Sequence, residues 1–392
     1  MLAKRVQVFS ESVIREMTRL AQAHQAINLG QGMPDFPAPQ IIKDAAIQAI
    51  QEDFNQYAIT WGAPGLRRAI AEKMRRFNGI ECDPETMITV CCGATECMMA
   101  TMLATIDPGD EVIIFQPFYE NYGPDALLTG ATPRFVQLRP PGWGFDPDEL
   151  RAAFNSKTRA IILNTPNNPT GHIFTHAELS LIAELCQEYD ALAFADEIYE
   201  YIRYSDKPHL SIATLPGMAD RTVTISGLSK TFSITGWRLG YCVASPELTT
   251  GIRKAHDFLT VGAPHPLQVA GAVAMGLPDS YYTSLCEGYR KRRELFLPYL
   301  HQAGFTVYEP EGAYYVMVDI RPLGFANDTA FVQQMIREIG VSAVPGSSFF
   351  SPKESGSHLV RFMFAKRDET LHAAGERLQR LRALRPTTVS GQ

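Results

Sequence analysis

The stretch that decides the fold is SGLSKTFSITGWRLG, residues 226–240. It directly follows the β-branched run 222–225, which predicts a buried parallel strand. Lys230 therefore comes just past the carboxyl end of that strand, among small hydroxyl residues, and Arg238 follows eight positions later. A lysine in such a turn is ordinarily a solvated surface residue. Whether Lys230 has a functional role depends on which residues follow the other strands at the same edge of the sheet.

Further apolar runs alternate with helical patterns from residue 87 onward. Runs without polar alternation are typical of parallel strands that are covered on both faces. With helices such as the one expected over 175–189 they predict an α/β fold with a doubly wound domain, and a smaller α+β domain is expected after a long helix over 280–303. We expect an N-terminal arm with part of the small domain over residues 1–45, a large domain over 46–285 and the C-terminal small domain over 286–392. The runs are 87–90, 111–115, 160–163, 191–195 and 240–244.

Composition excludes several classes of protein. The chain is 45% hydrophobic and 20% charged, as is usual for globular proteins, and its net charge of −6 with no basic block argues against nucleic-acid binding. No apolar run reaches signal-peptide length or the ~20 residues of a membrane helix. The seven cysteines show neither a disulfide framework nor metal-ligand spacing, which predicts reduced thiols, no metal and a cytoplasmic location.

The ends of the strands carry the candidate functional residues, because ligands of open α/β sheets bind at the carboxyl ends of strands. The run 87–90 is followed by CCGATE, 91–96, which opens a helix whose N–H groups suit a phosphate, although ordinary capping by Thr95 explains this piece equally well. Tyr119 follows 111–115 and offers a ring to a planar ligand. The rigid turn NTPNNPTG, 164–171, would fix the amide of Asn168.

Asp196 follows the run 191–195, and Tyr199 comes three residues later. A carboxylate after a buried run is costly unless it faces a cation or accepts hydrogen bonds, and capping of the next helix is the competing explanation. Together the strand ends supply a phosphate cradle, an aromatic plate, an amide, a carboxylate, a phenol and a lysine. This set suits a flat, phosphorylated pyridine aldehyde that is bound to Lys230 as a Schiff base.

Four motifs carry a resemblance to a known family. NNPTG at 167–171, DEIY at 196–199, SKTF at 229–232 and GWRLG at 236–240 occur in the order and spacing of the class I/II aminotransferases, which the chain resembles from about residue 28 to about residue 364. These are pyridoxal-phosphate (PLP) enzymes of fold type I. The segment LGQGMPDFP, 29–37, is similar to the kynurenine/glutamine/methionine aminotransferase branch. The resemblance implies that the 46–285 domain, a mostly parallel sheet, binds PLP.

The resemblance implies catalytic roles for three residues. Lys230 would carry the cofactor and shuttle the proton of the reaction, Asp196 would pair with the pyridinium nitrogen, and Tyr199 would hydrogen-bond the ring's 3-oxygen together with Asn168. Tyr119 would stack on the ring.

The resemblance also implies anion-binding residues. Arg361, in the motif LVRF at 359–362, would bind the substrate α-carboxylate as a bidentate fork, alongside Asn168 and the backbone of Gly32. In a homodimer, Tyr57 of the partner subunit would add to the phosphate site. The phosphate ligands within the subunit would be Ala94, Thr95, Ser229 and Arg238.

Two positions depart from the family pattern. Gly227 stands where many relatives carry a hydroxyl residue that contacts the phosphate, so one hydrogen bond is expected to be lost unless Ser226 supplies it. Thr95 stands where some members of the named branch carry a tyrosine.

The leading hypothesis is a PLP-dependent aminotransferase that moves an amino group between an α-amino acid and a 2-oxo acid. The branch points to aromatic or sulfur-containing donors such as methionine, phenylalanine, glutamine or kynurenine. The alternative is a PLP-dependent cysteine-conjugate or cystathionine β-lyase. A non-catalytic PLP-binding regulator would need a basic helix-turn-helix extension, and none is expected from this sequence.

The substrate pocket is expected to form from the N-terminal arm, Trp61, and the pair Tyr314 and Tyr315, which would suit apolar or aromatic side chains. These tyrosines are equally good strand core. No arginine stands out in the sequence as the partner of a second carboxylate. His265 is expected to have only a structural or helix-entry role.

Overall fold

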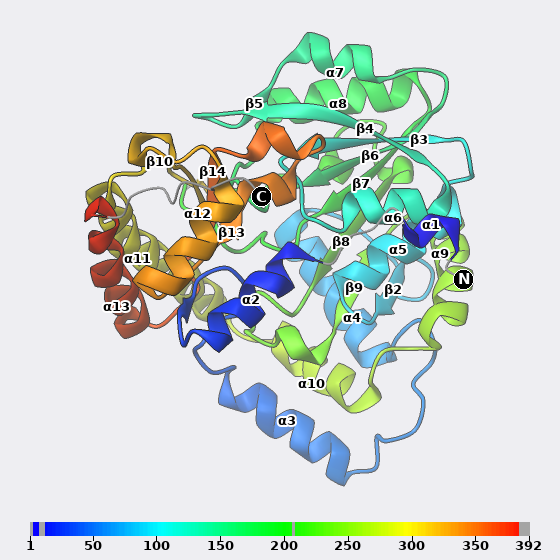
Figure 1. Ribbon diagram of the computed structural model, residues 1–392. Helices are drawn as coiled ribbons and strands as arrows, with labels where there is room; N and C mark the ends of the chain where they lie inside the picture. The colour runs from blue at the N-terminus through cyan, green and yellow to red at the C-terminus, as the bar shows by residue number, and fades with distance from the viewer. Residues whose placement is uncertain (1–2, 8–11, 206–207, 384–392) are drawn as a thin grey trace.

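The computed structural model describes residues 3–7, 12–205 and 208–383, and its largest element is an eight-stranded sheet (Figure 1). The strands lie in the order β2-β9-β8-β7-β6-β3-β4-β5. Their bounds are β2 Ile88–Cys91, β3 Glu111–Gln116, β4 Thr132–Arg139, β5 Gly144–Phe145, β6 Thr158–Asn164, β7 Leu192–Asp196, β8 Thr222–Gly227 and β9 Gly240–Val243.

Helices cover both faces of this sheet, which explains the unbroken apolar runs of its central strands. Successive side chains of a strand point to opposite faces. Val112 and Ile114 of β3 accordingly belong to the core beneath α5, whereas Ile113 and Phe115 belong to the core beneath α8. The helices of this part of the chain are α3 Gln40–Gln51, α4 Pro64–Lys73, α5 Ala94–Thr105, α6 Tyr122–Thr129, α7 Pro147–Ala153, α8 His176–Glu188, α9 Pro246–Thr260 and α10 His265–Met275.

The direction of β9 corrects the sequence-based interpretation. Strands β3, β4, β6, β7 and β8 are parallel, but β9 runs antiparallel to both β8 and β2, with Gly227 opposite Gly240. The apolar run 240–244 predicts a parallel strand, but burial on both faces produces the same apolar pattern in either direction. The antiparallel direction brings the start of β9 back beside the end of β8, so Arg238 and Lys230 lie at the same edge of the sheet.

Two strands at the edge of the sheet were not predicted. Side chains of β4 alternate between exposed and half-buried in its first half, and β5 has only two residues. Edge strands are covered on one side only, so they lack the continuous apolar run by which the central strands were found.

A second sheet forms the core of the C-terminal part, in the antiparallel order β10-β11-β14-β13. Strand β1 of the N-terminal arm pairs with β12, so the arm folds together with the C-terminal chain. The elements are β1 Ile27–Asn28, β10 Thr306–Tyr308, β11 Tyr315–Asp319, β12 Val341–Ser342, β13 Val344–Pro345, β14 Leu359–Met363, α1 Lys4–Gln7, α2 Val13–Ala23, α11 Asp279–Ala303, α12 Asp328–Gln334 and α13 Asp368–Leu378.

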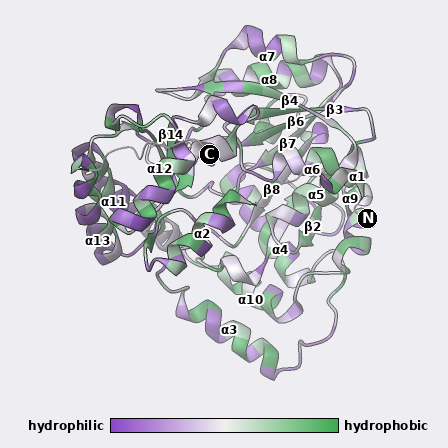
Figure 2. Ribbon diagram, viewed as in Figure 1, coloured by the Kyte–Doolittle hydropathy of each residue, from purple (hydrophilic) through white to green (hydrophobic). Residues whose placement is uncertain are grey.

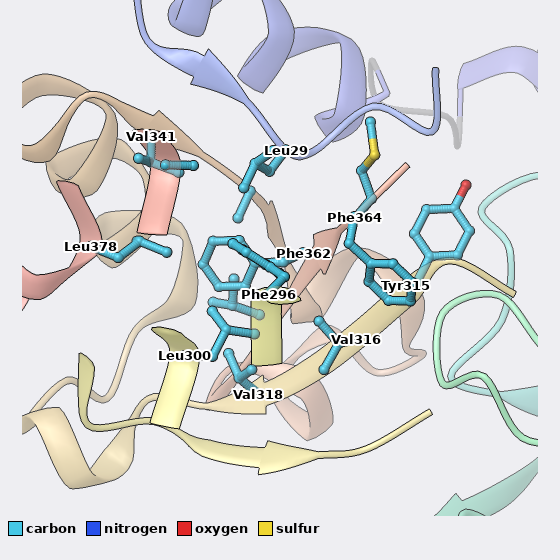
Figure 3. Close-up of a cluster of buried hydrophobic side chains, with 14 of the residues drawn as sticks. Leu29, Phe296, Leu300, Tyr315, Val316, Val318, Val341, Phe362, Phe364 and Leu378 are labelled. Atoms are coloured by element: carbon cyan, nitrogen blue, oxygen red, sulfur yellow. The ribbon is translucent and has the colours of Figure 1, made fainter. Parts of the chain in front are cut away.

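Figure 3 shows how the arm is held: Leu29 lies among Phe296 of α11 and Phe362 of β14, and all three are fully buried. Figure 2 shows hydrophobic residues concentrated in the central strands and many hydrophilic residues on α11 and α13. The expected boundaries at 45/46 and 285/286 fall inside α3 and α11, and the division into 1–45, 46–285 and 286–392 stays a prediction. Within the described residues, no helix combines the length and apolarity needed to cross a membrane.

Candidate active site

A cavity of about 590 Å³ lies at the carboxyl edge of the large sheet and is also lined by Tyr315 of β11 and Arg361 of β14. It gathers every residue predicted to bind the cofactor or the substrate's α-carboxylate except Tyr57, whose side chain is 85% exposed and does not line the cavity. The predicted residues that line it are Gly32, Ala94, Thr95, Tyr119, Asn168, Asp196, Tyr199, Ser229, Lys230, Arg238 and Arg361.

Lys230 occupies the turn after β8 and lines this cavity. Its Nζ lies 3.4 Å from the carbonyl oxygen of Gly32 and 5.9 Å from the ring centroids of both Tyr199 and Tyr314. Burial lowers the pKa of Lys230, and the positive charge of Arg238 lowers it further. An amine with a lowered pKa is neutral more often near pH 7, as a nucleophile or a base must be.

Asp196 ends β7 with both carboxylate oxygens bonded. Oδ2 accepts a hydrogen bond from the Tyr122 hydroxyl at 2.6 Å, and Oδ1 accepts one from the Ile198 amide at 3.2 Å. Burial nevertheless raises the pKa of Asp196 to about 6. Capping of the next turn accounts for Oδ1 but not for the carboxylate's place in the cavity lining. A cationic N–H that faced this carboxylate would keep it ionised.

Arg361 is a buried cation without an anion. It is 1% exposed, donates from Nη1 to Oδ1 of Asn168 at 2.7 Å and from Nη2 to the Gly30 carbonyl at 2.7 Å. Its guanidinium lies over the rings of Tyr315 and Phe349, and its Nε has no hydrogen-bond partner. In the described ranges no carboxylate pairs with it. A buried unpaired charge is costly, so this arrangement indicates a site for an anionic ligand.

The start of α5 forms a second anion site. The helix begins at Ala94 after Gly93, and no side chain caps it. A Cβ at position 93 would lie 2.5 Å from Nη2 of Arg238, so only glycine lets the guanidinium approach the helix end. Thr95 and Ser229 line the same part of the cavity. Uncapped N–H groups, hydroxyls and a guanidinium are the donors that a phosphate needs.

Steric crowding explains why position 227 is glycine and not the hydroxyl residue that many relatives carry. A Cβ there would lie 2.8 Å from the carbonyl oxygen of Leu239, because β8 and β9 approach closely at this point. Ser226 does not replace the missing hydroxyl, since its Oγ donates to Glu200 at 2.8 Å on the other side of the strand.

Two tyrosines support the predicted site residues, and sequence reasoning missed one of them, Tyr122. Tyr122 holds Asp196, and Tyr315 places its hydroxyl 3.1 Å from that of Tyr199. Of the three aromatic residues expected in the substrate pocket, Tyr315 lines the cavity, whereas Trp61 and Tyr314 do not. Tyr122 follows the end of β3 by six residues, so the strand-end rule was a signal for it.

Three charged residues of the lining were also missed: Glu120, in the segment after β3, and two that come from helices. Arg15 comes from α2, and Asp125 comes from α6. Asp125 is 6% exposed, its Oδ2 lacks a hydrogen-bond partner, and burial raises its pKa to about 7. Neither belongs to a motif of the sequence, and only the fold brings them to the cavity.

Outside the cavity, a set of buried charged and polar side chains forms what we call the ion cluster. Lys73 Nζ lies 2.5 Å from Oε1 of Glu200, and His209 Nε2 lies 2.8 Å from Oε2 of Glu197. The Asn78 amide donates to both glutamates at 3.1 and 2.9 Å. None of these residues lines the cavity.

The fold and the site define a PLP-dependent enzyme of fold type I. A lysine and a carboxylate, both set at the ends of sheet strands, face a phosphate-type donor set and a buried arginine. The chain belongs to the aminotransferase class I and II family, whose model matches residues 24–378.

Similar proteins cover nearly the whole chain. It is 39% identical to the "Probable N-succinyldiaminopimelate aminotransferase DapC" of Mycobacterium tuberculosis, over 99% of this chain and 100% of the relative. It is 36% identical to the methionine aminotransferase of Escherichia coli (94% and 96% covered) and 37% identical to human kynurenine–oxoglutarate transaminase 3 (95% and 89% covered). A solved structure of the M. tuberculosis N-succinyldiaminopimelate aminotransferase superposes with a TM-score of 0.95 at 39% identity, over 97% of this chain and 100% of that one.

These similarities confirm the fold, the branch with methionine and kynurenine aminotransferases, and aminotransferase activity with PLP as cofactor. They give no support to the β-lyase alternative. The residues also fit the cofactor: the cradle that Gly93 opens beneath Arg238 suits a phosphate, and the buried Arg361 suits a substrate carboxylate.

Proposed function

We propose that this aminotransferase takes the amino group from an aromatic or sulfur-containing α-amino acid, passes it to a 2-oxo acid, and uses Lys230 as its central residue. The observation that carries the proposal is the convergence of Lys230, Asp196 and Arg361 on one cavity.

PLP would be held by side chains that the cavity already brings together. Asp196 would face the pyridine nitrogen, Tyr119 would stack on the ring, and Asn168 and Tyr199 would donate to the ring's 3-oxygen. When bound, PLP supplies an electron sink for the bond that breaks at the substrate's Cα. The phosphate ligands would be Ala94, Thr95, Ser229 and Arg238.

Lys230 would move the proton. Its Nζ would take the proton from the substrate's Cα, which requires a neutral amine. The lowered pKa that burial gives Lys230 supports this role. The hydroxyls of Tyr199 and Tyr315, 3.1 Å apart, lie in the same lining and would exclude water from this side of the amine.

Arg361 would orient the substrate by binding its α-carboxylate. The Asn168 amide holds Nη1 of the guanidinium, and the Gly30 carbonyl holds Nη2, which fixes the plane of the fork. The backbone of Gly32 would lie alongside; a Cβ there would lie 2.0 Å from the Tyr315 hydroxyl, so this position requires glycine. A fixed planar fork is suited to a carboxylate.

The side chain of the donor would lie against the apolar part of the lining, which Ile14, Met33, Ile198 and the ring of Tyr315 provide. Two relatives are named for methionine and kynurenine, whose side chains are sulfur-containing and aromatic. The relative named for N-succinyldiaminopimelate makes a longer donor the second candidate.

Replacement of the lysine tests the proposal. Lys230→Ala should lower turnover by at least about 10³-fold, because the nucleophile and the proton carrier are lost together. Lys157→Ala, on an exposed loop, is the matched control and should transaminate like the wild type. Full turnover in Lys230→Ala would contradict the proposal.

A panel of donors tests the substrate class. Methionine, phenylalanine, kynurenine, glutamine and N-succinyldiaminopimelate would each be assayed with 2-oxoglutarate and with pyruvate. We expect 2-oxo acid products from the aromatic and sulfur-containing donors, and only when an acceptor is present. Pyruvate and ammonia formed from cystathionine without any acceptor would instead show lyase chemistry.

We also propose a homodimer in which Tyr57 of the partner subunit reaches the phosphate site. In this subunit Tyr57 is 85% exposed, and Phe258, at the end of the neighbouring α9, is 91% exposed. His265, the first residue of α10, bonds the carbonyl of Gln56 and fixes the segment that carries Tyr57. Light scattering should give twice the monomer mass, and Tyr57→Phe should weaken PLP binding.

We propose that the protein works in the cytoplasm. All seven cysteines are free thiols, which fits a reducing compartment. Fractionation of the source cells, followed by immunodetection, checks this location.

A further inference from the structure

The cavity lining contains a cation to which the roles above give no task. Four positively charged side chains line it: Arg15, Lys230, Arg238 and Arg361. The roles given above match Arg238 with the phosphate and Arg361 with the α-carboxylate, and Lys230 carries the cofactor. Arg15 is left over.

The guanidinium of Arg15 has no acceptor in the part of the chain that the structure describes. Arg238 donates to the carbonyls of Thr235 and Cys92, and Arg361 donates to Asn168 and Gly30. The backbone amide of Arg15 donates to Ser12, and among the described residues its side chain makes no hydrogen bond. Its side chain is exposed at the rim, so its charge is available to a ligand in the cavity.

Arg15 is nevertheless held in place by the helix that carries it. Ser12 caps α2 by accepting from the Arg15 amide, and its Oγ donates to both carboxylate oxygens of Glu120, at 2.8 and 2.9 Å, in the segment after β3. Further along the helix, Thr18 accepts from Asn28 at 3.3 Å. Ser12, three residues before Arg15, thereby fixes the first turn of α2 to the cavity wall at Glu120.

The carboxylates of the cavity lining do not neutralise Arg15, so its charge favours an anionic ligand. Of the lining carboxylates, Asp196 accepts from Tyr122, Glu120 accepts from Ser12, and Asp125 is buried deep in the wall. None of them pairs with Arg15. The volume of about 590 Å³ leaves room beyond a cofactor for a substrate that extends toward the rim.

We propose that Arg15 binds the distal carboxylate of a dicarboxylic substrate whose α-carboxylate lies on Arg361, and that the enzyme therefore prefers 2-oxoglutarate to pyruvate as acceptor. The proposal rests on the function proposed above, because it uses the same cavity and the same α-carboxylate site. A charge-assisted hydrogen bond at the rim discriminates an acceptor with a distal carboxylate from one without it. The same contact serves a donor that carries a distal carboxylate.

Acceptor kinetics of the holoenzyme test the proposal with methionine as donor. Arg15→Gln keeps a good helix former and removes the charge. We expect kcat/KM for 2-oxoglutarate to fall about tenfold, mainly through KM, while kcat/KM for pyruvate stays within about twofold. Arg151→Gln, an exposed arginine of α7 outside the cavity, is the control and should change neither value.

A second variant and a donor assay sharpen the test. Arg15→Glu should lower kcat/KM for 2-oxoglutarate further than Arg15→Gln and leave pyruvate unchanged. Glutamate as donor should lose as much as 2-oxoglutarate, whereas methionine should not.

The outcomes separate this inference from the proposed function. Wild-type protein that transaminates with neither acceptor would contradict the function itself. Transamination with an unchanged ratio of the two acceptors in Arg15→Gln, an equal loss for both, or a wild type that uses pyruvate alone would each overturn the role of Arg15.

Discussion

Two groups of buried charge lie on opposite sides of the same short segment, residues 196–200. Asp196 and Tyr199 line the cavity, whereas Glu197 and Glu200 belong to the ion cluster. Each group contains a lysine: Lys230 on the cavity side and Lys73 in the cluster. Lys230 follows the end of β8, and Lys73 pairs with Glu200, which also accepts a hydrogen bond from Ser226 of β8.

The two groups differ in how their charges are matched. Lys73 is 1% exposed and lies 2.5 Å from Glu200, which is 2% exposed, so these charges cancel within the protein. On the cavity side, neither Lys230 nor Arg361 hydrogen-bonds a carboxylate of the described chain. A buried charge that is matched internally serves the fold, and one left unmatched beside a cavity marks a ligand site. The type of residue alone does not distinguish the two.

The largest expected effect is a difference in the free energy of unfolding between variants of Lys73 and Lys230. Lys73→Met leaves Glu200 buried without its cation, and we expect it to lower the free energy of unfolding by about 3–5 kcal/mol. Lys230→Met removes a cation that has no carboxylate partner and should change stability by no more than about 1 kcal/mol. Urea unfolding of both variants measures the difference. Equal losses in the two variants would show that the two groups do not differ in this way.

If Lys73→Met does not fold, the double variant Lys73→Met with Glu200→Gln provides the control. It removes both charges of the pair, and because no charge is then left unpaired, it should recover part of the lost stability.

A smaller expected effect is a change with pH in the stability that Asp125, a carboxyl without a cationic partner in the cavity wall, contributes. Burial raises the pKa of Asp125 from 3.8 to about 7. The unfolded carboxyl ionises from about pH 4 upward but the folded one only near pH 7, so the stability that Asp125 contributes is complete below pH 4 and is lost as the pH rises to about 7. Asp125→Asn cannot ionise. Between pH 5 and pH 8 its unfolding free energy should therefore rise by about 3 kcal/mol relative to the wild type.

Denaturant unfolding of the two proteins at pH 5 and pH 8 measures this change. A difference between Asp125→Asn and the wild type that stays constant with pH would mean that the carboxyl is ionised in the fold and has a partner.

The smallest expected effect tests the fork geometry of Arg361. Arg361→Lys keeps the charge but loses the planar pair of donors, and Asn168 and Gly30 can no longer hold it in one orientation. We expect KM for the amino donor to rise at least about tenfold, with a smaller change in kcat. Arg151→Lys is the control. An unchanged KM would place the α-carboxylate elsewhere.

Most residues that line the cavity could be predicted from the sequence, because they come directly after strands of the large sheet. Lys230, Asp196 and Asn168 each come just after an unbroken apolar run, and ligands of such sheets lie at those ends. Burial on both faces hides strand direction, so the antiparallel β9 was not foreseen. Strand β4, next to the edge of the sheet, was missed because its alternating side chains look like a surface segment.

The ion cluster and the rim could not be predicted, because they depend on distant contacts. Lys73 and Glu200 are 127 positions apart, and Ser12 and Glu120 are 108 apart. No local sequence pattern predicts a contact between residues so far apart in the chain. Likewise, the scattered cysteines at 91, 97 and 242 lack any spacing motif, yet the fold brings their sulfur atoms within 4.8 Å of one another.

The most direct test of the central claim asks which lysine carries the cofactor. The purified holoenzyme would be reduced with sodium borohydride, which fixes a lysine-bound pyridoxal group irreversibly, then digested and mapped by mass spectrometry. The role of Lys230 as the cofactor's attachment site predicts one modified lysine per chain, at Lys230, with Lys73 unmodified. A pyridoxyl group on Lys73 or on any other lysine, with Lys230 unlabelled, would contradict it.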